Sequence, residues 1–230
     1  AAADLCSGRG LDALTTNALA KEVMYLPRIA SDERDAFERS KHAEGYPSFR
    51  INNQRGGEYV PADRHEQHFP IVFFEPFTPL TSKRLGLDLL SEADTRTFVQ
   101  QAIDTGVATA SIDARTAAAD EYLVFQAVYA DKPKPGPDAV TERRQLVSGL
   151  VAVKVDARRL LAMSRPLNPN MSVAVCARPA LDPGRCVALA RQVSAEAPSA
   201  GRWMFSTLMR DRDVVVGNQH FLVRFQQDIH

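Results

Sequence analysis

The chain has 230 residues, which suits one large domain or two small ones, and a chain of this length buries enough surface to fold without disulfides or metals. Its 28 lysines and arginines balance 28 aspartates and glutamates, so the formal net charge is zero. This balance argues against general nucleic-acid binding, which needs clustered excess cations. No apolar run approaches the ~20 residues that span a bilayer.

The first part of the chain is predicted to alternate helices and strands. Apolar spacing predicts a helix over Leu11–Met24, and Ser31, followed by acidic residues, has the features of an N-cap for a helix that runs to about Ala43. Pro27 places the strand around it at a sheet edge or ends its pairing. The strands predicted in this region are Val23–Ile29, Ser48–Asn52, Glu58–Pro61 and Phe69–Glu75.

Leu85–Gly106 contains a helix that is marked at both ends. Ser91 has the features of an N-cap, and Asp94 occupies the capping-box position three residues later. Gly106 stands where a left-handed residue would end the helix. The residues that form a single apolar face on this helix are Phe98, Val99, Ala102 and Ile103.

The rest of the chain is predicted to consist mostly of strands. Ala130–Thr141 is rich in proline and is predicted to be a domain boundary or a large loop, and Asp156 begins a short helix to Met163. Each half then holds a helix or two and about five strands, which indicates two α/β modules in tandem. The predicted strands are Val107–Asp113, Tyr122–Tyr129, Gly149–Val155, Ser172–Ala177, Cys186–Gln192, Trp203–Met209, Val214–Val216 and Phe221–Phe225.

The cysteines and histidines allow few firm conclusions. Cys176 and Cys186 flank a turn-rich stretch, so they are either a disulfide between neighbouring strands or two buried thiols, and Cys6 is left over as a free thiol or a link between chains. His65 and His68 lie three residues apart, as two metal ligands on a helix would. Because their neighbours are polar and no third ligand stands at a telling distance, a solvated surface loop is favoured.

Asp88 is an aspartate among leucines. A carboxylate in such surroundings must be paired or hydrogen-bonded, because its desolvation costs several kcal/mol. A structural role, with bonds from backbone amides or a pair with Lys83 or Arg84, is favoured by the residues alone over a role in ligand binding. The chain has no Gly-rich phosphate loop, nucleophile elbow or Cys-x-x-Cys pair, so nothing in it supports catalysis.

Several segments occur in an order and at separations shared with a known family. They are Tyr25–Ser40, Gly45–Ile51, Phe69–Pro76, Leu85–Arg96, Ala102–Ser111 and Gln126–Tyr129. In these segments the chain resembles the CHASE domain, the extracytoplasmic sensory module of transmembrane histidine kinases and cyclases, including the plant cytokinin receptors. The resemblance covers Val23–Tyr129 strongly and is looser beyond.

The resemblance implies an α+β fold. An N-terminal helix over residues 1–24, the remnant of a stalk, would precede two tandem PAS-like modules with antiparallel sheets: a membrane-distal ligand-binding module over residues 25–140 and a membrane-proximal module over residues 141–230. The resemblance also implies a periplasmic or extracellular location, flanking membrane helices outside this chain, and a homodimer formed through the stalk helices. The full-length receptor would be a histidine kinase, with a diguanylate or adenylate cyclase as the alternative. This domain would be no enzyme and would use no cofactor, metal or nucleic acid.

The resemblance also implies a ligand site. In the cytokinin-binding members, the aspartate of a Leu-Asp-x-x-Ser segment contacts the adenine ring, and this position falls on Asp88. A small planar ligand such as isopentenyladenine would bind Asp88, a backbone group near Ala110 and an apolar pocket. The alternatives are a sensor for a different small molecule and a non-sensing dimerisation module. The other residues implied in ligand binding are Phe73, Leu87, Thr105, Val107, Ala108, Arg115, Thr116 and Phe125.

Overall fold

The computed structural model describes residues 20–91, 93–112, 121–156, 159, 171–178, 187–192, 206–216 and 219–229. The chain divides into two compact units. One, the five-stranded unit, consists of Glu22–Ser111 and Leu123–Val153, and the other, the four-stranded unit, consists of the rest. Helices and mostly antiparallel sheets together make the architecture α+β, as the resemblance implied. Among the described residues, no helix is both long and apolar enough to cross a membrane.

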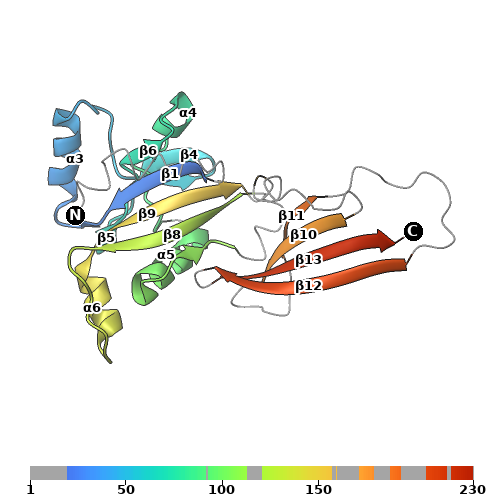
Figure 1. Ribbon diagram of the computed structural model, residues 1–230. Coiled ribbons are helices and arrows are strands. Elements are labelled where there is room, and N and C mark those ends of the chain that lie inside the picture. The colour runs from blue at the N-terminus through green and yellow to red at the C-terminus, as the bar shows by residue number, and fades with distance from the viewer. Residues whose placement is uncertain are drawn as a thin grey trace. The chain divides into compact units, whose positions relative to one another are not determined.

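The five-stranded unit is built on one sheet with the order β6-β1-β9-β8-β7. Its strands are β1 (Ala20–Pro27), β6 (Phe73–Glu75), β7 (Thr109–Ala110), β8 (Glu121–Tyr129) and β9 (Val147–Asp156). β1 pairs antiparallel with β6, and β7 pairs antiparallel with β8. Figure 1 shows β9 running opposite to both of its neighbours, β1 and β8.

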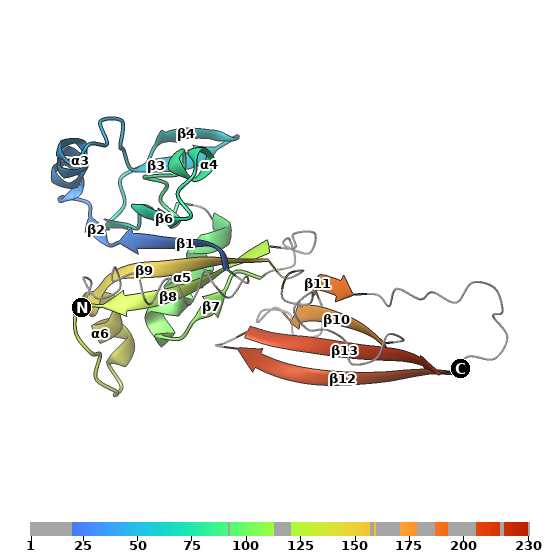
Figure 2. The same cartoon turned by 45° about the horizontal axis from the view of Figure 1, so that its top comes forward.

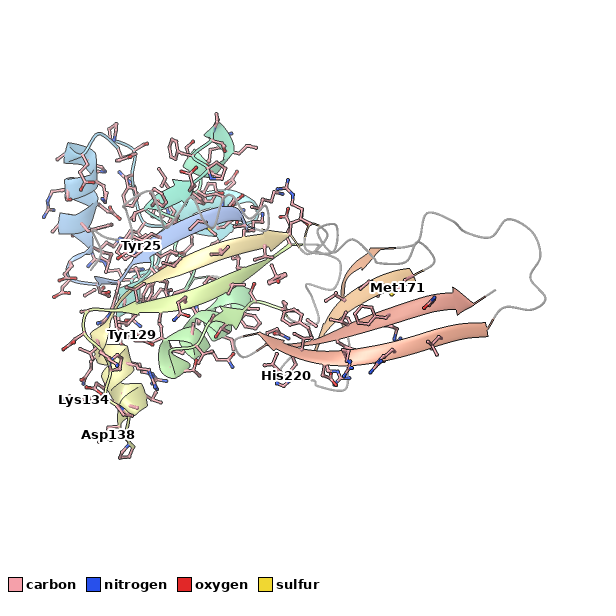
Figure 3. All side chains as sticks on the ribbon, in the orientation of Figure 1. Tyr25, Tyr129, Lys134, Asp138, Met171 and His220 are labelled. Atoms are coloured by element: carbon pink, nitrogen blue, oxygen red, sulfur yellow. The ribbon has the colours of Figure 1, made fainter. Side chains whose placement is uncertain are left out.

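Helix α5 (Ala93–Thr105) covers one face of this sheet. Its apolar residues Val99, Ala102 and Ile103 are buried in a core with residues of β1, β8 and β9, which confirms the predicted apolar face. The helix ends at Gly106, whose φ of 71° is in the left-handed region, as expected. Tyr129, labelled in Figure 3 at the end of β8, donates its hydroxyl to the carbonyl of Ile103 at 2.7 Å and so ties the end of α5 to the sheet.

Smaller elements surround the β6–β1 side of the sheet, whereas α6 (Ala139–Leu146) lies on the opposite side (Figure 2). These elements are α3 (Arg34–Ala43), α4 (Pro79–Ser82), the strand pair β2 (Ile29–Ala30) and β5 (Gln67–His68), and the hairpin β3 (Asn52–Arg55) and β4 (Glu58–Pro61). The hairpin turns at Gly56 and Gly57, whose φ values of 59° and 89° suit a two-residue loop. Ile29, Phe49 and Ile51 form a second apolar cluster, against which Phe37 of α3 packs.

The four-stranded unit contains a second antiparallel sheet with the order β11-β10-β13-β12. Its strands are β10 (Met171–Arg178), β11 (Val187–Gln192), β12 (Ser206–Val216) and β13 (Gln219–Ile229). β12 is one continuous strand where the sequence predicted two. The charges in its middle interrupt the apolar pattern but do not interrupt pairing, because Arg224 of β13 donates to both oxygens of Asp211 at 2.9 and 2.8 Å.

Several other sequence predictions were wrong near the start of the chain. Ala20–Met24, expected at the end of a helix, lies in β1, while residues 1–19 lie outside the described residues. Of the two alternatives for Pro27, the sheet edge is wrong, because β1 has a neighbour on both sides, and the end of pairing is confirmed, because Pro27 is the last residue of its strand. Helix α3 begins after Glu33 rather than Ser31, because the amide of Ser31 bonds across to the carbonyl of Glu66.

Other predicted elements are shorter than expected or extend over a different range. Ser48–Asn52 joins a strand only at its last residue, and Phe69–Glu75 is strand only from Phe73 onward. Val107–Asp113 contributes only the two residues of β7. Most of the helix expected from Asp156 to Met163 lies outside the described residues. The five-stranded unit continues through α6 and β9 to Val153, so the boundary expected at residue 140 lies inside it.

Candidate functional site

Asp88 belongs to a short segment that is held on both sides by backbone hydrogen bonds. The Asp88 amide donates to Asn52 at 2.8 Å, and the Ile71 amide donates to Leu87 at 3.0 Å. The segment starts at Gly86, whose φ is 83°, and a Cβ there would overlap the carbonyl oxygen of Arg50. Only glycine fits this close approach, so Gly86 positions the aspartate.

The Asp88 carboxylate is fully buried and bonded to three protein groups. Its Oδ1 accepts from the amides of Phe69 and Leu90, each at 3.0 Å. Its Oδ2 lies 2.7 Å from Nδ1 of His68. The bonds from backbone amides were expected for a structural role of Asp88, but its side-chain partner is His68. Of the two cations that the sequence offered as partners, Lys83 and Arg84, Arg84 instead pairs with Glu22 at 2.5 Å.

His68 was wrongly predicted to lie in a solvated loop. It is fully buried on β5, where it pairs with Ile29 of β2, while His65 is exposed and its ring centroid lies 6.0 Å from that of His68. The residues that precede His68 are polar, and for this reason the sequence predicted an exposed loop. The signal that could have revealed it is the apolar run that begins at Phe69, immediately after it. Across the described part of the chain, no three His, Cys, Asp or Glu side chains gather to hold a metal ion.

The Asp88–His68 pair has defined hydrogen-bonding capacity left. An ionised carboxylate has about four acceptor positions, of which Asp88 uses three, so one remains on Oδ2. Because the carboxylate accepts, it selects the tautomer of His68 with the proton on Nδ1, and in that tautomer Nε2 has a bare lone pair. Nε2 is buried and has no hydrogen-bond partner among the described residues. The interior next to Asp88 therefore offers acceptors for N–H groups.

The family is settled by comparison with known proteins. A family model for the CHASE domain matches residues 11–183, which is well over half of the chain. The chain belongs to the CHASE domain family. CHASE domains are extracellular or periplasmic sensory modules of membrane signalling receptors, and this domain is accordingly a sensor and not an enzyme. No curated protein matches the chain.

The residues implied in ligand binding divide into two groups in this CHASE domain. Leu87 and Phe125 are buried in the same apolar core, and Ala110 is buried on β7. Phe73 and Val107 are 37% and 41% exposed, so their side chains lie at the surface of the unit. Thr105 is also exposed, Ala108 is half-buried, and Arg115 and Thr116 lie outside the described residues.

The cysteines agree with the location of a CHASE domain. Cys176 of β10 is disulfide-bonded, so the alternative that it is a buried free thiol is wrong. The other two cysteines, Cys6 and Cys186, lie outside the described residues. Disulfides form and persist in oxidising compartments such as the periplasm and the cell exterior.

Proposed function

We propose that this CHASE domain binds a small planar ligand in its five-stranded unit, and that the ligand is an adenine-type cytokinin such as isopentenyladenine. The receptor that carries the domain would be a sensor histidine kinase. Its two units would be PAS-like modules, distal and proximal to the membrane, in a homodimer joined by stalk helices. The observation that carries the proposal is the buried Asp88 at the family's adenine-contacting position, with one acceptor position still open on Oδ2.

The chemistry of the site suits an adenine. Its exocyclic amine and a protonated ring nitrogen are N–H donors, and the interior around Asp88 offers acceptors. Apolar side chains, among them Leu87 and Phe125, are packed in the core of the same unit, and ligand sites usually combine apolar side chains with a few polar groups. The isoprenoid tail of the ligand would lie against them.

The ligand would enter by displacing β5. Asp88 and His68 are fully enclosed, so a ligand reaches them only when the structure opens. The ladder between β5 and β2 consists of two residue pairs, Ile29 with His68 and Ala30 with Gln67, so few ladder bonds oppose its opening. A ligand that binds one arrangement of β5 better than another shifts the balance between them, which is the requirement for sensing.

A non-sensing extracytoplasmic module is the second candidate function. The observation that favours it is that Asp88 already has three protein partners and no exposure. In this reading the aspartate holds the turn before α5 together. A CHASE sensor for a different small molecule is an intermediate case, because the site and the opening would be the same and only the ligand would differ.

The test is calorimetric titration of the domain with isopentenyladenine, together with the thermal shift that the ligand causes. We expect binding by the wild type and at least about tenfold weaker binding by Asp88→Asn, which keeps the shape of the side chain but turns one acceptor into a donor. Absence of heat and of thermal shift at high ligand excess would rule out the cytokinin. Equal binding by Asp88→Asn and wild type would rule out the role of Asp88.

A further inference from the structure

We propose that His68 Nε2 and Asn53 Oδ1 form a buried acceptor pair that binds two N–H groups of the ligand, and that Asp88 sets the polarity of this pair. The inference rests on the proposed function, because it assigns the ligand contacts of the same site. It adds two residues that the family resemblance does not supply, and it predicts which edge of a planar ligand the domain recognises.

Two buried polar atoms carry the inference. Within the described part of the chain, only His68 Nε2 and Asn53 Oδ1 are buried side-chain nitrogen or oxygen atoms without a hydrogen-bond partner. Leaving such an atom unsatisfied costs about 1–3 kcal/mol, and buried polar groups in folded proteins are nearly always bonded to protein, water or ligand. Two such atoms in one unit therefore indicate a bound group that donates to them.

The strand register places the two atoms on the same side as Asp88. Paired residues in neighbouring strands point to the same side, and successive residues alternate. Asn53 therefore lies beside Asp88 with its side chain on the same side, and His68, two residues before the bridged proline, shares that side. The bridges that fix this register are Asn52 with Leu87 in parallel and Pro70 with Asp88 in antiparallel orientation.

Asp88 selects the tautomer of His68 in which Nε2 accepts. The carboxylate accepts, so of the two tautomers it favours the one with the proton on Nδ1, 2.7 Å from Oδ2, and in that tautomer Nε2 keeps its lone pair. Nε2 and Asn53 Oδ1 do not bond each other, because both atoms are without a partner. The occupant must therefore donate twice. The chemical class that fits is a planar group with two N–H donors on one edge, as in an amidine, or in an aminopurine whose ring nitrogen next to the amine carries a proton.

Three probes test the acceptor pair: adenine, hypoxanthine, which has a carbonyl acceptor in place of the exocyclic amine, and benzamidine, a two-donor group that is not a purine. We expect the wild type to bind adenine and benzamidine about tenfold or more tightly than hypoxanthine, equivalent to about 1.4 kcal/mol. His68→Asn keeps a donor toward Asp88 but has no Nε2, so it should lose this preference, and Asn53→Ala should weaken it.

Asp88→Asn gives the most specific readout. Its amide can donate to His68 Nδ1, which moves the histidine proton to Nε2 and turns the acceptor into a donor. Nitrogen chemical shifts of His68 should report the proton on Nδ1 in the wild type and on Nε2 in the variant, and the preference for benzamidine over hypoxanthine should then be lost. The exposed His65→Asn is the matched control and should change neither the shifts of His68 nor the preference.

The outcomes separate this inference from the proposed function. If the wild type binds benzamidine through His68 but binds no purine, the acceptor pair stands and the cytokinin is ruled out. If isopentenyladenine binds wild type and His68→Asn equally, the cytokinin stands and the acceptor pair is ruled out. If no two-donor probe binds and a buried water alone occupies the two acceptors, the acceptor pair is likewise ruled out as a ligand site.

Discussion

Replacing Asp88 by alanine should destabilise the five-stranded unit strongly. The carboxylate is the only side-chain partner that the structure gives to the Phe69 and Leu90 amides, and it also holds His68 Nδ1. Alanine leaves these donors without an acceptor in a buried place, at about 1–3 kcal/mol for each donor that finds no substitute. Because His68 can shift its proton and the segment can relax, we expect a total loss of about 3–5 kcal/mol.

Asparagine at the same position should cost much less. Its Oδ1 still accepts from the two amides, and its Nδ2 still bonds His68 once the imidazole proton moves, so a loss of about 1 kcal/mol is expected. The surface provides a matched control in the same unit. Asp63 pairs with Arg55 at an exposed site, and Asp63→Ala should change the free energy of unfolding by less than about 1 kcal/mol.

The assay is urea denaturation at neutral pH followed by circular dichroism at 222 nm. Among the described residues, the helices α3, α4, α5 and α6 all lie in the five-stranded unit, so the signal follows the unfolding of this unit. We expect the midpoint to fall in the order Asp63→Ala, Asp88→Asn, Asp88→Ala with a similar slope for each. If Asp88→Ala costs no more than Asp63→Ala, the carboxylate does not hold these three donors and the site geometry is wrong. For this reason, binding experiments at Asp88 should use asparagine.

Three further predictions concern other parts of the chain. Gly86→Ala should lower the free energy of unfolding by about 2–5 kcal/mol, because of the left-handed φ and the overlap of the new Cβ with a carbonyl oxygen. Gly45→Ala is the control: with a φ of 99° and nothing within 4 Å, it should cost only the conformational part, about 1–2 kcal/mol. Equal losses of the two variants in urea denaturation would contradict the overlap. The side-chain hydrogen bonds from Arg144 hold the pKa of Asp104 below its ordinary value of 3.8, so the stabilisation by this pair is present at higher pH and is lost as the pH falls below that value. In Asp104→Asn the urea midpoint should therefore fall less steeply between about pH 5 and pH 2 than in the wild type. A parallel decline in both proteins would refute this. Reducing the disulfide of Cys176 should lower the stability of the four-stranded unit by about 2–5 kcal/mol, seen as faster amide exchange in β10, and unchanged exchange would argue against its contribution.

Local patterns in the sequence were enough to identify α5 and its orientation. The apolar face with Val99 and Ile103 and the stop at Gly106 depend on contacts between residues a few positions apart, and a helix is held by such contacts. Strands β8, β9 and β10 were also predicted to within two residues at each end, because alternation and turn residues are local signals. The ordered segments identified the CHASE family, and the match over residues 11–183 confirms it.

The role of Asp88 depended on contacts that no local pattern encodes. The sequence showed a carboxylate among leucines and left its partner open. Its actual partner, His68, is twenty residues away and looked like a surface residue, because burial on a two-residue strand leaves almost no periodic signal. Tertiary pairing of segments distant along the chain brought the two together and placed Asn53 beside them. The charge at the centre of the site was thus readable from the sequence, whereas the direction of its hydrogen bonds was decided only by the fold.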